Sequence, residues 1–456
     1  MRMGDEQLAR ALGEWRRDGE PLIAALAGAV RDAVLDGRLR TGTALPAERR
    51  LAAALGVSRG TVTAALARLR DDGWVDTRHG SASTLRLPTS SYENTGHETY
   101  APLSATGRTG PIDLRRAVPA APQDAYRAAT LRAVERAGLL LAEDGEPGAG
   151  LPELRALIAG RHTREGLPTR PEQILVTSGA RSAFALLCAE SRPRVAAVEV
   201  PTYLDALHVL RGAGARLTGC RVTTDGWDPD QLDAAFTAAR GQLAYLVPDF
   251  QSPTGALMDA GTRRTVAELA ARHEVTVVAD ETMRELDLRD EPRPLPRIRR
   301  AVLIGSLSKT VWGGLRVGWI RGPASLVGAL RRNPLCAPLA AAPMQQLIAV
   351  ELLADAAALL RFRRAELRAQ RDHLSGLLAG DGRWDFTVPD GGLALWLRLS
   401  GTRADTVVER VRAAGLGLTA GPRFAPDATL THHLRVPYTP APAVLDRVAA
   451  ALGGAV

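Results

Sequence analysis

The sequence contains almost no lysine. Of its 58 lysines and arginines only Lys309 is a lysine, and the other 57 are arginines. Arginine replaces lysine in ion pairs and phosphate binding, but its guanidinium stays protonated and cannot act as an amine nucleophile. A single retained lysine therefore points to amine chemistry, most simply a Schiff base with a carbonyl compound. Chance retention in an arginine-rich chain is the alternative, and the residues around Lys309 must decide between the two.

Cysteine is scarce as well. The three cysteines (Cys188, Cys220 and Cys336) are widely spaced and form no CxxC pair, which indicates neither a disulfide framework nor a zinc site. Acidic residues stand close to the first methionine, without a signal-peptide apolar core, so we expect a cytoplasmic protein. The most apolar window, residues 337–360, contains two glutamines and two acids, which favours a buried helix over a membrane span. We therefore expect no membrane partner.

Length and composition predict several folded domains. A chain of 456 residues exceeds one ordinary core, and 46% hydrophobic residues can bury a large one. Residues 1–87 have a helical pattern rich in Ala, Leu and Arg, and residues 88–111 are typical of an interdomain linker. Residues 112–456 form the second domain, with a smaller α+β subdomain expected from about Phe362. We see no internal repeat.

Short apolar runs alternate with amphipathic helices in this second domain. Five runs, rich in Val, Ile and Leu and bounded by turn residues, are QILVTSG, VAAVEVP, LAYLVPD, VTVVAD and AVLIGS. Such runs are typical of buried strands in a mainly parallel sheet. Because a helix follows most of them, the sequence predicts an α/β layered domain.

A helix-turn-helix pattern occupies the N-terminal region. Residues 48–55 carry an apolar face, Gly56 suits the left-handed turn that ends a helix, and Ser58 can cap the next one. The second helix has apolar residues at helical spacing: Val62, Ala65, Leu66 and Leu69. Its first outward-facing residues are those that reach base edges in the major groove: Arg59, Gly60, Thr61 and Thr63. The segments WVDT and STLRL around RHGSA predict a two-stranded wing.

Positive charge is concentrated in the same region. Between Arg38 and Arg86 stand nine arginines and four acids, so nine minus four gives +5 of the chain's net +8. A local basic patch on such a scaffold is typical of DNA binding. A small helical cap with solvated arginines is the alternative interpretation.

The pattern LPAER…LGVSRGTV…L…G…G resembles the winged helix-turn-helix of the GntR family of regulators. The resemblance implies that the partner is double-stranded operator DNA. It also implies base or phosphate contacts from Arg49 and Arg59. The supporting residues that it implies are Ser58, Thr61, His79 and Gly80. Gly60 stands where the family commonly has threonine, which weakens the expected readout at one base.

The residues around Lys309 supply what pyridoxal phosphate needs: an amine, an anion site, an acid for the pyridine nitrogen and a flat contact for the ring. Asp280 ends the run VTVVAD, where a carboxylate keeps the ring nitrogen protonated, and Tyr203 can lie over the ring face. The phosphate candidates are amides at a predicted helix start, two hydroxyls and one guanidinium: Gly179, Ala180, Arg181, Ser306, Ser308 and Arg316.

Residues 112–456 resemble the fold type I aminotransferases. The resemblance rests on GLPELRALIAGR, ILVTSGAR, PDFQSPTG, ADET and SLSKTVWGGLRVGW, which stand in family order. Joined to a GntR head, this resembles the MocR subfamily of bacterial regulators. The resemblance implies that Lys309 forms the Schiff base, that Asp280 binds the pyridine nitrogen, and that Arg435 holds the carboxylate of an amino-acid-like ligand. It also implies a head-to-tail homodimer.

Two positions depart from the aminotransferase pattern. Ser252 replaces the Asn of the usual NPTG motif, and Met283 replaces the Tyr of Asp-x-x-Tyr. Both family residues hydrogen-bond the cofactor's phenolic oxygen. Ser252 can still reach that oxygen, whereas Met283 cannot donate a hydrogen bond. We therefore expect weaker control of the Schiff-base pKa and poor transamination.

Three functions remain open at this point. The first is a transcriptional regulator, nucleoid-associated when bound to DNA, that senses pyridoxal phosphate or its adduct with an amino acid or amine. The second is a working aminotransferase with an autoregulatory DNA-binding head. The third is a DNA-binding protein whose aminotransferase fold serves only for dimerisation. The complete helix-turn-helix pattern argues against the second, and Lys309, Asp280 and Arg316 argue against the third.

Overall fold

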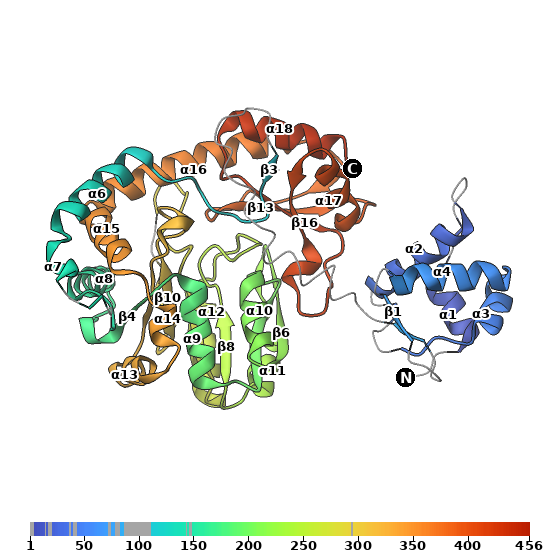
Figure 1. Ribbon diagram of the computed structural model, residues 1–456, viewed down its shortest axis with the longest axis horizontal. Coiled ribbons are helices and arrows are strands. Elements are labelled where there is room, and N and C mark those ends of the chain that lie inside the picture. The colour runs from blue at the N-terminus through green and yellow to red at the C-terminus, as the bar shows by residue number, and fades with distance from the viewer. Residues whose placement is uncertain are drawn as a thin grey trace. The chain divides into compact units, whose positions relative to one another are not determined.

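The computed structural model divides into two compact units (Figure 1). The N-terminal unit comprises residues 1–110 with 427–431, and the C-terminal unit comprises residues 111–426 with 432–456. The structure describes residues 4–13, 15–16, 21–35, 38–39, 43–71, 74–77, 83–85, 111–142, 144–145, 148–292 and 295–456. The predicted linker, residues 88–111, lies outside the described residues except for Pro111.

The N-terminal unit is a small helical domain with a two-stranded ribbon. Its elements are α1 (Asp5–Leu12), α2 (Leu22–Leu35), α3 (Glu48–Leu55), α4 (Arg59–Asp71), β1 (Val75–Asp76) and β2 (Thr84–Leu85). The strands pair antiparallel, with Val75 opposite Leu85, as the predicted wing requires. Helix α1 packs against α2 and α3, and Leu8 and Leu12 join the apolar core.

The helix-turn-helix forms as predicted. Gly56 ends α3 in the left-handed conformation, with φ 62° and ψ 41°. Ser58 caps α4, because its Oγ accepts a hydrogen bond from the Thr61 N–H at 3.0 Å. The buried side of α4 consists of the four residues expected from their spacing: Val62, Ala65, Leu66 and Leu69. This turn fixes the start of α4 and therefore the placement of its exposed first residues.

A mixed eight-stranded sheet organises the C-terminal unit. Its order is β4 (Ile174–Thr177), β11 (Gly318–Arg321), β10 (Val302–Ser306), β9 (Thr276–Asp280), β8 (Leu243–Leu246), β5 (Val195–Val200), β6 (Arg216–Thr223) and β7 (Gly226–Trp227). Strands β10, β9, β8, β5 and β6 run parallel, while β11 is antiparallel to both of its neighbours. All five predicted strands are present. Strands β6, β7 and β11 were not predicted.

Helices cover both faces of this sheet. One face packs against α9 (Ala180–Ser191), α10 (Leu204–Gly212) and α13 (Ala324–Arg332). The other face packs against α11 (Pro229–Ala238) and α12 (Ala260–His273). Alternation along the strands sets the faces: Tyr245 of β8 points to the first, and its neighbours Ala244 and Leu246 to the second. Asp280 lies two residues after Val278, which also faces the first core, so Asp280 and Tyr245 share one side.

A third core lies beyond β4. Its helices are α6 (Gln123–Arg136), α7 (Gly138–Leu141), α8 (Pro152–Arg164) and α15 (Pro343–Ala354), whereas α14 (Cys336–Leu339) packs against α9 and α13 on the first face. Trp319 and Val176 contribute to this core from the sheet. Among the described residues no single helix is long and apolar enough to cross a membrane. Helix α15 reaches the required length and apolar character only when it is joined to the next helix, Ala356–Leu378, and the two are bent by 84° relative to each other.

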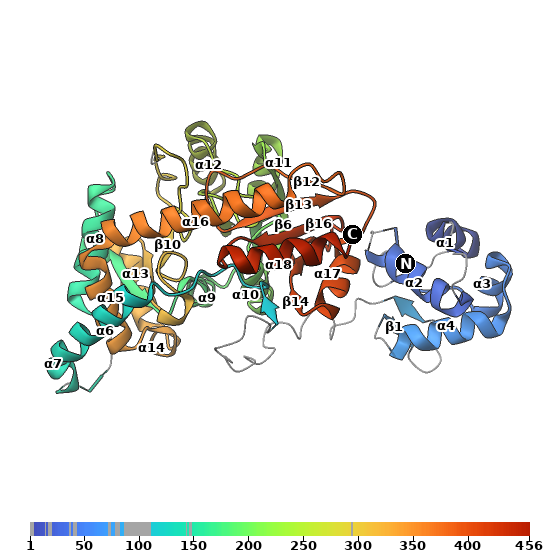
Figure 2. The same ribbon diagram turned by 90° about the horizontal axis from the view of Figure 1, so that it is seen from above.

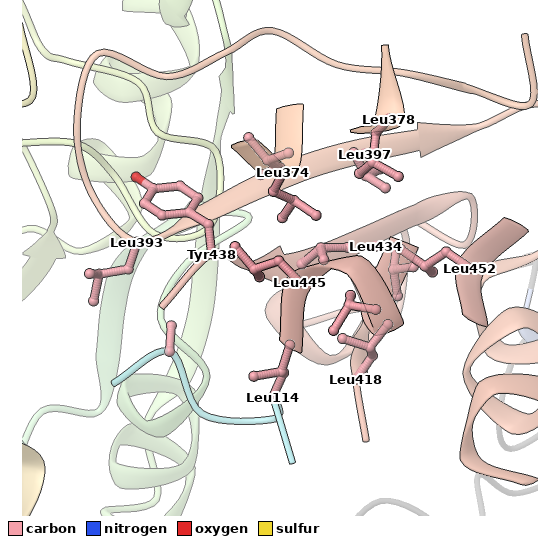
Figure 3. Close-up of a cluster of buried hydrophobic side chains, with 14 of the residues drawn as sticks. Leu114, Leu374, Leu378, Leu393, Leu397, Leu418, Leu434, Tyr438, Leu445 and Leu452 are labelled. Carbon is pink, nitrogen blue, oxygen red and sulfur yellow. The ribbon is translucent and has the colours of Figure 1, made fainter. Parts of the chain in front are cut away.

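The C-terminal part forms the α+β subdomain expected from about Phe362. It contains α16 (Ala356–Leu378), β12 (Trp384–Asp385), β13 (Ala394–Leu399), α17 (Ala404–Ala413), β14 (Leu416–Gly417), β15 (Thr419–Ala420), β16 (His433–Pro437) and α18 (Pro442–Gly453). Four strands make an antiparallel sheet in the order β12-β13-β16-β15. Figure 3 shows its core, in which Leu397, Leu434 and Leu445 gather.

A segment from the start of the C-terminal unit completes this subdomain. We call residues 111–120 the strap. Its strand β3 (Ile112–Asp113) pairs in parallel with β14 (Figure 2). Leu114 and Ala117 of the strap, only 5% and 4% exposed, join the subdomain core, where Figure 3 shows Leu114 near Leu418 and Leu445. The subdomain therefore combines two segments that are about 250 residues apart in the sequence.

Candidate cofactor site and DNA-binding surface

Lys309 lies on the turn after β10, in a setting that favours a neutral amine. Its Nζ donates a hydrogen bond to the Ala117 carbonyl oxygen at 2.7 Å. Burial, followed by the nearby Arg435 and Arg116, lowers the pKa of Lys309 to about 8, against the opposing effect of Asp280. A lysine with a lowered pKa carries more of the nucleophilic amine at neutral pH.

Asp280 is held rigidly at the end of β9. Its side chain is nearly buried, at 4% exposed. One carboxylate oxygen accepts from the Tyr245 hydroxyl at 2.6 Å, and the other accepts from the Thr282 N–H at 2.9 Å. These two donors fix the orientation of the carboxylate. A carboxylate held in this way is suited to the ring nitrogen of the cofactor.

The start of α9 and the turn after β10 form a continuous cradle. Gly179 precedes α9 with a positive φ of 118°, and the Ala180 and Arg181 amides occupy the helix's first turn. Gly318 approaches so closely that an added Cβ would stand 2.7 Å from the Gly179 backbone. Gly318 pairs with Ser306, whose hydroxyl lies 3.0 Å from that of Ser308. Amides at a helix start and two hydroxyls are suited to a phosphate.

Arg181 and Tyr203 meet at Asp205. The Tyr203 hydroxyl donates to Asp205 at 2.7 Å, and Arg181 stands 4.0 Å from the same carboxylate. Burial, with Asp205 beside it, raises the pKa of Tyr203 well above its ordinary value, so the ring carries a neutral hydroxyl. Arg316 follows the short helix η2 (Gly313–Leu315), with a positive φ of 56° and an exposed side chain.

Arg435, on β16, is a buried guanidinium with one donor to spare. The residue is 5% exposed, and its Nη2 donates to the Arg115 carbonyl oxygen at 2.5 Å. Its Nε is buried without a hydrogen-bond partner among the described residues. Burial lowers the pKa of Arg435 to about 10, which leaves it charged at neutral pH. An unpartnered buried donor beside Lys309 suits the carboxylate of a ligand.

Ser252 and Met283, the two departures from the aminotransferase pattern, line one small pocket. Ala117, Phe250, Gly391 and Leu393 contribute to the same walls. Met283 is 5% exposed and brings no donor to this side. Lys309 and this pocket share a boundary, because Ala117 lines the pocket and accepts the Lys309 hydrogen bond.

These groups fit pyridoxal phosphate by their donor chemistry. An amine of lowered pKa, a buried carboxylate and a cradle of helix amides with hydroxyls stand at the ends of neighbouring sheet elements. The spare Nε of Arg435 adds a place for an anionic ligand. Among the described residues no cluster of acids, histidines and cysteines could hold a metal ion.

Sequence reasoning missed residues with supporting roles. The Tyr245 hydroxyl donates a hydrogen bond to the Asp280 carboxylate, and the Ala117 backbone oxygen accepts one from the Lys309 amine. Gln251 donates to buried Glu199 at 3.0 Å and to the Pro201 oxygen at 2.7 Å. It thereby ties the segment before Tyr203 to the turn that carries Ser252. Alternation along β8 could have placed Tyr245, but a backbone contact leaves no mark on the sequence.

The DNA-binding candidates lie mostly at the exposed start of α4. Ser58 and Arg59 are exposed, Thr61 is half-buried, and Arg49 is exposed on α3. The Ser58 hydroxyl is engaged in the helix cap, which makes its role structural as well. Glu48 joins the two helices, because it accepts from Thr63 at 2.7 Å. His79 and Gly80 lie outside the described residues.

Two family models match this chain. The family "Aminotransferase class I and II" matches residues 142–452, and "Bacterial regulatory proteins, gntR family" matches residues 22–85. The first match spans more than half of the chain and contains Lys309, Asp280 and Arg435. The second contains α2, α3, α4 and both strands of the ribbon.

Relatives share this two-part arrangement over most of the chain. The HTH-type transcriptional regulator YisV of Bacillus subtilis is 28% identical and covers 85% of this chain and 86% of its own. The pyridoxine biosynthesis regulator PdxR of Corynebacterium glutamicum is 29% identical, covering 86% of each. The probable rhizopine catabolism regulator MocR of Rhizobium meliloti is 28% identical, covering 69% and 68%.

Solved structures agree on the fold of the C-terminal unit. The α-aminoadipate aminotransferase LysN of Thermus thermophilus, complexed with N-(5'-phosphopyridoxyl)-L-leucine, superposes with a TM-score of 0.68. The two chains are 24% identical, and the match covers 77% of this chain and 95% of LysN. The likeness confirms the predicted fold type I architecture.

Proposed function

Because this chain belongs to the aminotransferase class I and II family and joins that domain to a gntR-family segment, the MocR-type arrangement, we propose that it is a transcriptional regulator controlled by pyridoxal phosphate. One observation carries the proposal. Lys309, with a pKa lowered to about 8, lies beside Asp280 and Arg435 in a chain whose other unit presents the start of a recognition helix.

Each residue has a proposed role in binding. When bound, pyridoxal phosphate supplies an aldehyde that couples to amines and a ring that withdraws electrons. Lys309 holds the cofactor covalently, and Asp280 keeps a proton on the ring nitrogen. Tyr203 contacts the ring face, and Ser252 lies on the side of the phenolic oxygen. The phosphate is held by Gly179, Ala180, Arg181, Ser306, Ser308 and Arg316.

The effector that we propose is an amino acid or amine that forms an adduct with the cofactor. Arg435 binds the carboxylate of such a ligand, because its buried Nε is free to donate. For an amine without a carboxylate, Arg435 keeps its hydrogen bond to the Arg115 oxygen and its contact with the Phe424 ring, and gains no new partner. Comparing the affinity of an amino acid with that of its decarboxylated amine, in wild type and in Arg435→Gln, tests this role.

The N-terminal unit binds operator DNA through Arg49, Ser58, Arg59 and Thr61, together with His79 and Gly80, which stand between β1 and β2 in the sequence. We take residues 1–87 as the DNA-binding domain, 88–111 as the linker and 112–456 as the sensor domain. The protein acts in the cytoplasm and associates with the nucleoid when bound to DNA. Relatives named as HTH-type regulators support this assignment.

We further propose a head-to-tail homodimer. Leu131 and Val134 of α6 and Leu141 of α7 are 58%, 60% and 79% exposed, which is unusual for large apolar side chains. A dimer that covers them carries two DNA-binding units. We expect a DNase footprint over paired half-sites, spaced by more than one helical turn. Protection of a single half-site would contradict the dimer.

The proposal is tested by DNA affinity. We would measure binding to the DNA upstream of the protein's own gene, at fixed salt, with and without pyridoxal phosphate. The wild type should change its affinity with the cofactor, whereas Lys309→Ala should bind DNA but not respond. Unchanged wild-type affinity over a range of cofactor concentrations would contradict control by the cofactor alone.

A catalytic function is the second candidate, because Lys309, Asp280 and Arg435 are all in place. Steady-state turnover of an amino donor and a keto acid tests it. We expect little turnover, since Met283 brings no donor to the phenolic side. Rapid turnover together with weak DNA binding would favour the enzyme.

A further inference from the structure

The strap contacts two cationic groups of the site, Lys309 and Arg435, through its backbone. Lys309 Nζ donates to the Ala117 oxygen at 2.7 Å, and Arg435 Nη2 donates to the Arg115 oxygen at 2.5 Å. The strap is also the segment from which the chain continues, through residues 86–110, to the DNA-binding unit. The groups proposed to hold cofactor and ligand therefore also hold the segment that leads to the DNA-binding unit.

The C-terminal end of the strap is firmly anchored by Arg363 of α16. This side chain is buried, at 1% exposed, and its Nη2 donates to the Ala120 oxygen at 2.6 Å and to the Val311 oxygen at 2.9 Å. Its Nε donates to the Thr310 oxygen at 3.1 Å. Thr310 and Val311 directly follow Lys309. Arg363 is thus a positioning residue that fixes one end of the strap to the turn that carries the lysine.

The N-terminal end of the strap is held more weakly. The Ile112 N–H donates to the Gly415 oxygen, and the Leu114 N–H to the Gly417 oxygen, each at 2.8 Å. These bonds pair two-residue strands, and a pair so short gains little stability from its ladder. Since β3 lies between Arg115 and residue 111, a displacement of the strap at the site passes along the chain through β3 before it reaches the linker.

Loading the site competes directly with both strap contacts. When Lys309 Nζ forms a double bond to the aldehyde carbon, the aldehyde oxygen leaves as water and at most one hydrogen remains on the nitrogen. A Lys309 that held the cofactor in this way would have lost the hydrogens with which the free amine can serve the Ala117 oxygen, so this contact would weaken. A carboxylate that binds side-on to the spare Nε of Arg435 also reaches Nη2, where it is a stronger acceptor than the neutral Arg115 carbonyl. The Ala117 carbonyl is then left to find another donor, whereas the Arg115 carbonyl loses its shorter hydrogen bond and keeps only the Thr419 hydroxyl, 3.4 Å away.

We propose that the strap reports occupancy of the site to the DNA-binding unit. Binding at Lys309 and Arg435 releases Ala117 and Arg115, and β3 then separates from β14 while Arg363 keeps the far end in place. The inference rests on the proposed function, because it takes pyridoxal phosphate as the cofactor and the N-terminal unit as the DNA reader.

Hydrogen exchange on the full-length protein tests the release. With pyridoxal phosphate as the probe, amides of Ile112 and Leu114 should exchange about tenfold faster, the factor expected for losing one hydrogen bond to a charged group. The Tyr438 amide, bonded to the Leu393 oxygen in the same subdomain, serves as the internal control and should not change. Unchanged or slower exchange at Ile112 and Leu114, with the visible band of the bound cofactor present, would overturn the proposal.

A reversible crosslink tests the transmission. Ile112 and Leu416 are register partners, so Ile112→Cys with Leu416→Cys should form a disulfide that pins β3 to β14, and the native cysteines are buried. The oxidised variant should keep the visible band and its affinity for DNA without cofactor, but lose the cofactor-dependent change in that affinity. Reduction should restore the change, and the single variant Ile112→Cys should respond like the wild type throughout.

The two proposals fail in different ways. If the cofactor changes the DNA affinity of the wild type and of the oxidised variant equally, the proposal for the strap is wrong and the proposed regulatory function stands. A wild type that forms no visible band or binds no DNA contradicts the regulator, and the role of the strap with it.

Discussion

The two sides of the proposed cofactor ring are built differently. On the nitrogen side, the Asp280 carboxylate receives hydrogen bonds from Tyr245 at 2.6 Å and from the Thr282 amide at 2.9 Å. On the phenolic side, Met283 and Phe250 line a pocket in which Ser252 brings the one side-chain hydroxyl. The nitrogen side presents a carboxylate held by two hydrogen-bond donors, whereas the phenolic side offers few donors to a developing negative charge. We therefore expect this site to favour cofactor binding over catalysis.

Removing the charge of Asp280 should have the largest effect on the nitrogen side of the site. We expect Asp280→Asn to weaken pyridoxal phosphate binding roughly 100-fold, because a neutral amide cannot hold the ring nitrogen protonated. Titration of the visible band against cofactor concentration measures this. Asp259→Asn is the matched control, since Asp259 caps α12 at the Thr262 amide and lies outside the site. Equal losses in both variants would contradict the role of Asp280.

Lys309 lies between the two sides, and its titration sharpens the comparison. Because burial lowers its pKa to about 8, the reactive amine fraction rises as the pH approaches 8 from below and levels off above it. From pH 6 to pH 8 the rate of band formation should increase about 50-fold. The same rates with a free alkylamine correct for the ionisation of the cofactor. A rate that continues to rise up to pH 10 would show an unshifted lysine.

A change at Tyr245 tests whether cofactor binding depends on the residue that hydrogen-bonds Asp280. We expect Tyr245→Phe to weaken cofactor binding about tenfold, because Asp280 loses a short hydrogen bond while the ring packing against Phe184 is kept. Tyr438→Phe removes a comparable buried bond, to the Gly391 oxygen at 3.2 Å, within the other core. That control should lower stability without changing cofactor affinity. If both variants bind the cofactor as the wild type does, Tyr245 has no positioning role.

Restoring a hydrogen-bond donor on the phenolic side should reduce the difference between the two sides. Met283→Tyr is expected to lower the pH of the visible band's transition by about half a unit, since its hydroxyl stabilises the phenolate. Absorbance against pH measures the shift, and transaminase turnover should increase about threefold. Met283→Phe, of similar size but without the hydroxyl, should leave the transition unchanged. A shift in both variants would assign the effect to packing.

Local patterns were the most predictable part of this chain. Gly56, Ser58 and the apolar spacing of α4 predicted the helix-turn-helix, because each element there is fixed by its own neighbours in sequence. Strands β4, β5, β8, β9 and β10 were equally visible as apolar runs. Strand β6 was missed because it lies near the sheet edge, with Arg216, Gly219 and Arg221 exposed along it. Strand β11 was missed because its glycine and tryptophan belong to the motif around Lys309.

The long-range contacts of the site were less predictable. Lys309, Asp280 and Arg435 were identified from their motifs, whereas Ala117 acts through a backbone oxygen, which every residue possesses. Arg363 stands in a helix rich in arginine, where nothing in the sequence separates the buried one from its exposed neighbours. The joining of the strap to the small subdomain depends on tertiary packing alone. Such features follow from the fold and not from residue type.

The single lysine also allows the fraction of molecules with a carbonyl compound at Lys309 to be measured. A protease that cleaves after lysine has one target in the unfolded chain, the Lys309–Thr310 bond, and produces fragments 1–309 and 310–456. Borohydride reduction turns an imine at Lys309 into a substituted amine, which such a protease does not recognise. After reduction and digestion, the fraction of full-length chain on a gel equals the fraction of molecules that carried a carbonyl compound at the moment of quenching. Occupancy can thus be read from cells without purification or a chromophore.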